Sequence, residues 1–323
     1  MRVTNRVVIA LALLASLLSF AKFNYCAETG WKTPDQYVHA CYSDIPALYG
    51  ERGLDKGVWA YSNGESSVEY PVVQGAIMWA SAKVIPEGAN NYFYGSALLL
   101  ALLFIFIAFI VYRIRPEFGY LLPLAPAAIA SLYINWDLWA IATMMLAIYW
   151  FDRKQYLPSA VLLGISISTK FLPIFLLIPI VFIFWREAKM KEAIKYLAIT
   201  FGIWCALNLP FALTTPTGWW RFYKLNLDRG PDWGSFWLAL QQLGINLTNL
   251  NYLSVLLLLI ALTTIAILLF ELKYTPSLAS VAFFVIASVM LASKVYSPQY
   301  VLWLTPLAVI ALTNTKDLHA FWL

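Results

Sequence analysis

Long apolar runs separated by short polar segments make up most of this chain. Residues 96–112 (SALLLALLFIFIAFIVY) and 252–270 (YLSVLLLLIALTTIAILLF) are two examples. Each comes close to the roughly 20 residues that an α-helix needs to cross a bilayer. Since lipid offers exposed backbone no hydrogen-bond partner, the pattern predicts an all-α polytopic membrane protein.

The apolar runs predict about ten membrane-crossing helices with both chain ends on the cytoplasmic side. We expect them at residues 7–23, 92–112, 118–134, 138–151, 156–169, 171–185, 194–213, 252–270, 277–292 and 301–313. A further apolar stretch, residues 70–85, is too short and too broken to span. We expect it to form a helix in the membrane interface, anchored by Trp79 and Lys83.

Composition agrees with this reading and leaves no room for a soluble domain. Of the 323 residues, 61% are hydrophobic and only 12% are charged, whereas soluble proteins carry about 25% charged residues. We therefore expect residues 1–323 to form a single integral membrane domain. The net charge of +5 does not indicate nucleic-acid binding, because the charges lie beside the predicted spans.

The amino-terminal segment has the charge pattern of a signal peptide, with Arg2 and Arg6 before an apolar core. No A-x-A cleavage site follows, and the residues before Cys26 lack the small side chains of a lipoprotein cleavage box. We therefore expect a retained first helix that enters the membrane from the cytoplasm.

Charge asymmetry predicts the orientation of the bundle. The segments assigned to the cytoplasm hold 12 basic and 6 acidic residues, and the opposite side holds 10 basic and 11 acidic residues. This is the positive-inside pattern. The loops at about 24–91 and 214–251 are then extracytoplasmic, and long irregular loops often carry function.

Cys26 and Cys41 share the first of these loops, where a disulfide and two free thiols are equally compatible with the sequence.

Three polar clusters stand at the predicted outer ends of helices: NWD at 135–137, STKFLP at 168–173 and SKVYSPQY at 293–300. If the helices bundle, these clusters line one opening beneath the two loops. Lys170 and Lys294 at this level suit an anionic ligand such as a phosphate. The alternative is that each lysine simply extends to the membrane interface.

Asp44 is the leading candidate for an acid or base in the first loop. It lies in HACYSDIPALYGERG among apolar and aromatic residues, where partial desolvation would raise its proton affinity. Alternatively, it caps a short helix. Asp35, Asp55 and Glu69 compete with it for the same role.

The second loop contains WWRFYKLNLDRGPDWGSFW at 219–237, in which aromatics alternate with charged residues. Aromatic faces for a sugar ring, and charged groups such as Arg229 and Asp232 for hydroxyls or phosphate, suit a sugar or phosphosugar site. An aromatic belt at the membrane interface explains the same aromatics without a ligand.

Several common signatures are absent from the sequence. There is no P-loop, no GxGxxG, no HExxH and no GxSxG, which argues against an ATP-driven pump, a dinucleotide enzyme, a zinc protease and the common hydrolases. No Cys/His cluster has the spacing of a metal site.

The motifs together resemble the polyprenol-phosphate-sugar-dependent glycosyltransferases of the GT-C fold, in particular glycosyltransferase family 87, which includes bacterial mannosyltransferases. The resemblance is carried by CYSDIP, EYPV, NWDLWA, STKFLP, DRGPDWGSFW and SKVYSPQYVLWL, between about residues 42 and 304. The chain ends one helix after the last motif, whereas relatives often continue for further helices.

The resemblance implies an enzyme that transfers a sugar, most simply a mannose-like hexose, from a polyprenyl-phosphate donor to an extracytoplasmic glycan or glycolipid, with inversion. The donor is a lipid-linked sugar and not a nucleotide sugar, no cofactor beyond this donor is expected, and the need for a metal stays open. The lipid bilayer is the other expected partner, with no nucleic acid. The family's catalytic aspartate corresponds to Asp44. The expected substrate-binding residues are Lys170, Lys294, Tyr296, Gln299, Asp137, Arg229, Asp232, His39 and Glu69.

Two other functional classes remain open from the sequence. A transporter or flippase for a lipid-linked or small anionic substrate would place its binding groups near mid-membrane on broken helices and would show internal repeats. A membrane scaffold without catalytic activity would tolerate replacement of Asp44 by asparagine.

Overall fold

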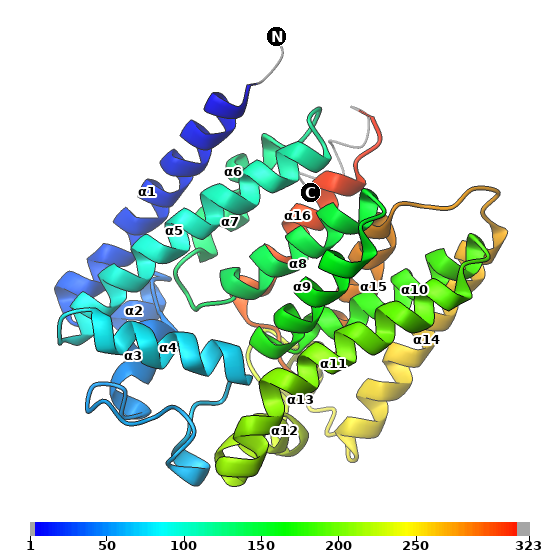
Figure 1. Ribbon diagram of the computed structural model, residues 1–323. Coiled ribbons are helices and arrows are strands. Elements are labelled where there is room, and N and C mark those ends of the chain that lie inside the picture. Colours follow the sequence, from blue (N-terminus) through cyan, green and yellow to red (C-terminus); the bar gives the residue numbers. More distant parts are fainter. Residues whose placement is uncertain (1–3, 315–323) are drawn as a thin grey trace.

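The computed structural model describes residues 4–314. Arg2, Lys316 and Asp317, which contributed to the charge count, lie outside this range. The described residues form helices joined by loops, as Figure 1 shows. The α-helices are α1 (Asn5–Thr29), α2 (Asp35–Val38), α3 (Asp44–Glu51), α4 (Val72–Val84), α5 (Ala89–Ile114), α6 (Leu121–Leu124), α7 (Pro126–Ser131), α8 (Leu138–Asp152), α9 (Tyr156–Thr169), α10 (Leu177–Arg186), α11 (Met190–Thr214), α12 (Pro216–Asp228), α13 (Phe236–Gln242), α14 (Leu250–Glu271), α15 (Leu278–Ala292) and α16 (Val301–Ala311). The 3-10 helices are η1 (Gly64–Ser66), η2 (Leu172–Leu176) and η3 (Pro298–Tyr300).

The apolar helices confirm the predicted all-α membrane architecture. Within the described residues, α1, α5, α11 and α14 are long and apolar enough to cross a membrane by themselves. Shorter apolar helices account for most of the other predicted spans, namely α8, α9, η2 with α10, α15, and η3 with α16. Most of the predicted boundaries agree with the structure to within a few residues.

One predicted span was wrong. Residues 118–134 do not form a continuous helix but two short ones, α6 and α7. Pro123 lies within α6, and Pro126 is at the start of α7. A proline removes a backbone donor and disfavours helix in the residue before it, which explains the interruption. After α7 an irregular segment leads to Asp137 at the start of α8.

Helix α9 packs closely against both α8 and α11. A side chain at Gly164 of α9 would come within 2.8 Å of atoms of α11, so glycine allows the two helices to approach. Ser166 of α9 donates a 2.8 Å hydrogen bond to the carbonyl of Ala140 in α8. Small residues and interhelical hydrogen bonds are typical of packing within membranes.

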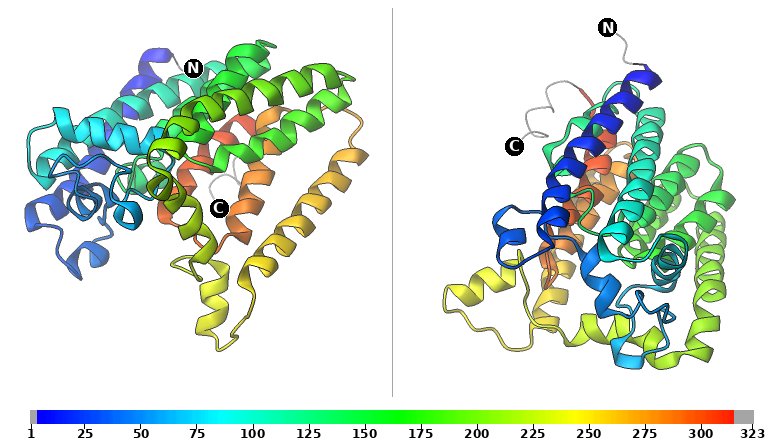
Figure 2. Two further views of the ribbon diagram at one scale, coloured as in Figure 1. Left: turned by 60° about the horizontal axis from the view of Figure 1, so that its bottom comes forward. Right: turned by 90° about the vertical axis from the view of Figure 1, so that its left-hand side faces the viewer.

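One end of the bundle carries the loops. The start of α1 and the end of α16 lie at the opposite end from α2, α3, α4, α12 and α13 (Figures 1 and 2). The predicted interfacial helix is α4, which contacts α5, α9 and α11. A disulfide joins Cys26 and Cys41, so the alternative of two free thiols is wrong. The loops therefore gather over the ends of α8 and α9.

Candidate active site

Asp44 is the first residue of α3, and the backbone around it is fixed to the rest of the bundle. The Asp44 N–H donates to the carbonyl of Ile134 at 2.7 Å, and the Ser43 hydroxyl donates to the carbonyl of Tyr133 at 2.7 Å. Ser43, not Asp44, is the helix cap, because its hydroxyl accepts from the N–H of Ile45. The interpretation of Asp44 as a helix cap is therefore wrong, and its carboxylate makes no capping hydrogen bond.

Two tyrosine hydroxyls donate to the Asp44 carboxylate. Tyr42 reaches Oδ1 at 2.8 Å, and Tyr70 reaches Oδ2 at 3.2 Å. The sequence analysis did not single out either tyrosine, although both lie within the family-like motifs CYSDIP and EYPV. Tyr70 precedes α4 by two residues, so no local pattern could indicate its contact with a residue 26 positions earlier.

Burial governs the acid–base properties of this group. Loss of hydration raises the pKa of Asp44, although the hydrogen bonds from Tyr42 and Tyr70 and the charge of Lys170 act in the opposite direction. Burial and the neighbouring carboxylate also raise the pKa of both tyrosines, which therefore remain neutral donors. A carboxylate with raised proton affinity suits general base chemistry.

A second charged group lies beside the first. Lys170 follows α9 directly, and its ammonium nitrogen is 2.8 Å from a carboxylate oxygen of Asp137 at the start of α8. The side chain of Asp137 is only 1% exposed and that of Lys170 is 17% exposed. The indole N–H of Trp303 in α16 donates to the other oxygen of Asp137 at 2.9 Å. The sequence analysis did not single out Trp303, although it lies in the motif SKVYSPQYVLWL. Its partner, Asp137, is 166 positions away in the sequence.

Tyr70 links the two groups. Its hydroxyl binds Asp44, and its ring centroid lies 4.6 Å from the ammonium nitrogen of Lys170, which is a cation–π contact. The first loop, α8, α9 and α16 therefore meet at one cluster, which we call the Asp44–Lys170 cluster: Tyr42, Asp44, Tyr70, Asp137, Lys170 and Trp303. The structure thus brings together three of the predicted site residues, Asp44, Asp137 and Lys170.

Several buried polar atoms near this cluster have no hydrogen-bond partner among the described residues. They include Nδ2 of Asn135, Nε1 of Trp136 and Oε1 of Gln299. Asn135 and Trp136 directly precede Asp137, and Gln299 lies in η3, which leads into α16. Unpaired buried polar atoms are costly, and hydroxyl groups of a bound ligand would satisfy them. The predicted residue Tyr296 packs edge-on against Tyr300 of η3, with ring centroids 5.9 Å apart.

The SKVYSPQY segment is also bonded to the second loop. Lys294 donates to the carbonyl of Leu227 at 3.1 Å and to the side chain of Asn251. Arg229 and Asp232 form an ion pair with each other, and the Asp232 N–H donates to the carbonyl of Lys294 at 2.9 Å. These bonds join the two segments and leave the predicted residues Lys294, Arg229 and Asp232 outside the Asp44–Lys170 cluster.

The remaining predicted residues bond within the first loop. His39 contacts Asp35 at 3.0 Å. Glu69 forms a two-pronged ion pair with Arg52, with N–O distances of 2.6 and 2.7 Å. Within residues 4–314, no group of three or more His, Cys, Asp or Glu side chains could hold a metal ion.

Comparisons with known proteins find one similar structure. No family model and no curated protein matches the chain. The crystal structure of ArnT from Cupriavidus metallidurans, bound to undecaprenyl phosphate, superposes with a TM-score of 0.56 at 13% sequence identity. The match covers 99% of this chain and 62% of ArnT. The chain has a GT-C-type fold. At this identity the likeness concerns the fold alone, and the chain spans less than two thirds of the length of ArnT.

Proposed function

We propose that this protein is a membrane glycosyltransferase that transfers a sugar from a polyprenyl-phosphate donor to a glycan or glycolipid acceptor. One observation carries the proposal: Tyr70 contacts both the partly buried carboxylate of Asp44, whose proton affinity is raised, and the partly buried ammonium group of Lys170. The GT-C-type fold, which ArnT shares in a structure with undecaprenyl phosphate, supports a lipid-phosphate ligand.

The reaction follows from the chemistry of these two groups. The Asp44 carboxylate takes the proton from an acceptor hydroxyl while its oxygen forms a bond to the anomeric carbon of the donor sugar. The bond from that carbon to the phosphate oxygen breaks on the opposite face, and polyprenyl phosphate leaves with the electron pair. In-line displacement inverts the anomeric configuration.

Phosphate needs charge stabilisation to leave, not a proton. A single carboxylate therefore suffices, in contrast to glycosidases, which need a second carboxyl group as acid. Lys170 supplies the positive charge. Asp137, whose other carboxylate oxygen accepts from Trp303, lies 2.8 Å from the ammonium nitrogen of Lys170, and an ammonium group has three N–H donors.

The identity of the substrates rests on the sequence motifs. Their resemblance to family 87 supports a hexose, with mannose as the first candidate. The positive-inside charge pattern supports an extracytoplasmic active face, because the cluster lies at the end of the bundle that carries the two long loops.

The test is transfer of radiolabelled sugar from polyprenyl-phosphate donors in membranes that hold equal amounts of wild type and variants. Asp44→Asn should lose almost all transfer. Asp55→Asn is the matched control, because Asp55 is an exposed aspartate of the same loop and should keep wild-type activity. Transfer that survives Asp44→Asn would reassign the base, and absence of transfer from every donor tried would favour transport.

A further inference from the structure

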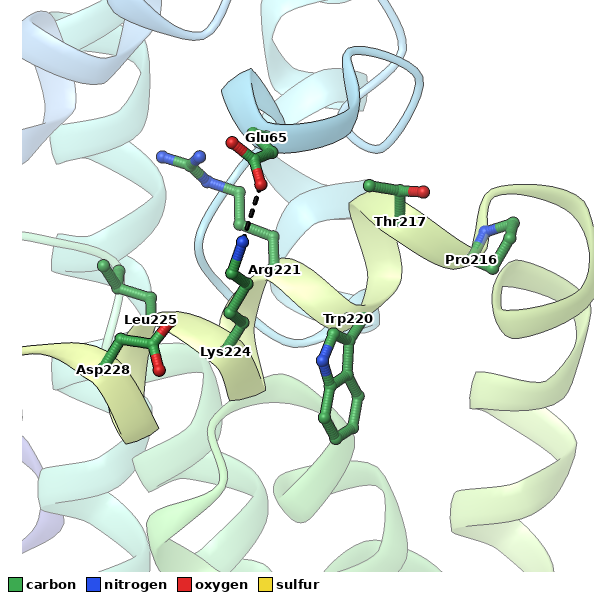
Figure 3. Close-up of a pocket in the computed structure, with 8 residues that line it drawn as sticks. All are labelled: Glu65, Pro216, Thr217, Trp220, Arg221, Lys224, Leu225 and Asp228. Atoms are coloured by element: carbon green, nitrogen blue, oxygen red, sulfur yellow. Dashed lines mark hydrogen bonds and ion pairs between the residues drawn. The ribbon is translucent and has the colours of Figure 1, made fainter. Parts of the chain in front are cut away.

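The outward face of α12 forms a hollow that the proposed reaction does not use. It has a volume of about 510 Å³ and is open to solvent (Figure 3), which is within the range of about 300–1,000 Å³ for small-molecule sites. Its main lining residues are Thr217, Trp220, Arg221, Lys224 and Asp228 of α12 and Glu65 of η1. The α12 residues occupy positions i, i+3, i+4, i+7 and i+11 from Thr217 and so share one face of the helix.

The opposite face of α12 covers the region beside the active site. Phe222 and Tyr223 pack against Phe171, which directly follows Lys170, with ring centroids 6.2 and 5.9 Å apart. Gly218 lies so close to the carbonyl oxygen of Tyr61 that a β-carbon there would come within 2.0 Å of it. The Tyr61 hydroxyl in turn donates to the carbonyl of Tyr70 at 2.9 Å. Helix α12 therefore separates the two regions: one face packs beside the Asp44–Lys170 cluster, and the other face, which carries the hollow, is turned to solvent.

The lining has the chemistry of a sugar site. Trp220 is 47% exposed, with its ring stacked on Tyr223 at a centroid distance of 5.3 Å, and an exposed indole face is a stacking surface for a sugar ring. Lys224 and Glu65 form an ion pair of 2.7 Å across the hollow, as Figure 3 shows. Arg221 forms no ion pair with another described residue, and its Nε is buried without a hydrogen-bond partner. These side chains offer both donors and acceptors to hydroxyl groups.

The charges select among possible ligands. The hollow contains two cations, Arg221 and Lys224, and two anions, Glu65 and Asp228. A lining without net charge does not favour a phosphate or another anion. Its exposure to solvent also does not suit an isoprenoid chain.

We infer that this hollow is a subsite for neutral sugar units of the acceptor, remote from the hydroxyl that reacts. This inference rests on the proposed function and adds that the acceptor is an extended, uncharged oligosaccharide. Its remote units stack on Trp220 and bond to Arg221, while its reacting end lies at Asp44.

The test is calorimetric titration of the purified full-length protein with three uncharged probes: mannohexaose, maltohexaose and cellohexaose. At least one should bind the wild type. Trp220→Ala should weaken that binding at least about 10-fold, and Trp220→Phe, which keeps an aromatic face, should weaken it less. Arg221→Gln should also weaken it, which guards against a local packing defect in Trp220→Ala.

Trp233→Ala is the matched control, because Trp233 is a 79% exposed tryptophan that does not line the hollow. It should bind as the wild type does. Failure of all three probes to bind the wild type would overturn the inference. Binding that is unchanged in both Trp220→Ala and Arg221→Gln would also overturn it.

Transfer activity tests the proposed function, whereas hexasaccharide binding and the KM for the acceptor test this inference, so the failure of one can be told from the failure of the other. Asp44→Asn should abolish transfer but leave hexasaccharide binding unchanged. Trp220→Ala should raise the KM for a long acceptor about 10-fold while the KM for the donor stays constant. Transfer that persists with equal acceptor KM in Trp220→Ala would refute the subsite and leave the transferase intact.

Discussion

Tyr70 donates a 3.2 Å hydrogen bond to Asp44 while its ring lies 4.6 Å from the ammonium nitrogen of Lys170. One side chain thus contacts both the proposed base and the proposed phosphate-stabilising group. Its hydroxyl and its ring serve different partners, so their effects can be separated by substitution.

Tyr70→Phe removes the hydroxyl and keeps the ring. A hydrogen bond to a charged group is worth about 1.5–3 kcal/mol, and this one favours the ionised form of Asp44. We therefore expect the acid limb of the pH–rate profile to move to higher pH, with little change in donor KM. Tyr70→Leu, which also removes the ring beside Lys170, should raise donor KM as well. Identical profiles for Tyr70→Phe and the wild type would contradict this role.

Transfer by the wild type should fall as the pH decreases, because the base must be ionised. Burial raises the pKa of Asp44, so the fall should begin above the pH range of an ordinary aspartate, whose pKa is about 3.9. The measurement is kcat/KM against pH. An acid limb at or below the ordinary aspartate value would argue against Asp44 as the base.

Asp44→Asn should lose activity without losing stability. The folded protein holds the Asp44 proton more tightly than the unfolded chain does. This group therefore favours folding most below its unfolded pKa, and the contribution is lost as the pH rises through the folded pKa. At neutral pH an uncharged amide avoids that cost. Thermal unfolding in detergent should give a Tm at least equal to that of the wild type, and a marked decrease would indicate a structural role instead.

Lys170 and Asp137 should depend on each other for stability. Removal of one member of a buried ion pair typically costs about 3–5 kcal/mol because it leaves an unpaired charge, while replacement of both by apolar residues is often close to neutral. We expect Lys170→Met and Asp137→Leu each to lower Tm, and the double variant to recover much of the loss. None of the three should transfer sugar. Full activity in the double variant would refute the role of Lys170.

The disulfide should stabilise the first loop. Cys26 and Cys41 are 15 positions apart, and closing a loop of that size is worth about 3 kcal/mol in the chain-entropy model. Cys26→Ser with Cys41→Ser should therefore lower the Tm of the oxidised protein. Reductant should lower the Tm of the wild type in the same way and leave the double variant unchanged. Equal Tm values with and without reductant in the wild type would contradict this.

The helices were predictable because the bilayer imposes a length and a composition on each span. The exception, residues 118–134, contains enough apolar residues to span, but Pro123 and Pro126 divide it. Hydropathy measures only how well side chains suit lipid. It does not indicate whether those residues form one uninterrupted helix.

Part of the candidate site was predictable for a related reason. Asp44, Asp137 and Lys170 are charged residues at places where charge is costly, and this signal is local. Tyr42, Tyr70 and Trp303 are aromatics in a chain with many aromatics. Tyr70 and Trp303 bond to residues 26 and 166 positions away, and Tyr42, two positions from Asp44, carries no charge that marks it in the sequence. Lys294 gave the same signal as Lys170, but its ammonium group bonds to Leu227 and Asn251.

The Ser43 hydroxyl and the Asp44 N–H, a group that every residue except proline carries, donate to the carbonyls of Tyr133 and Ile134. The backbone of the proposed base is thereby tied to the membrane bundle, while its carboxylate accepts hydrogen bonds from Tyr42 and Tyr70 of the loop itself. The part of the loop that contains η1 and Glu65 makes no hydrogen bond to Asp44 among the described residues. Under the proposed function, such an arrangement would let segments of the loop alter the acceptor range while the backbone of the base stays in place.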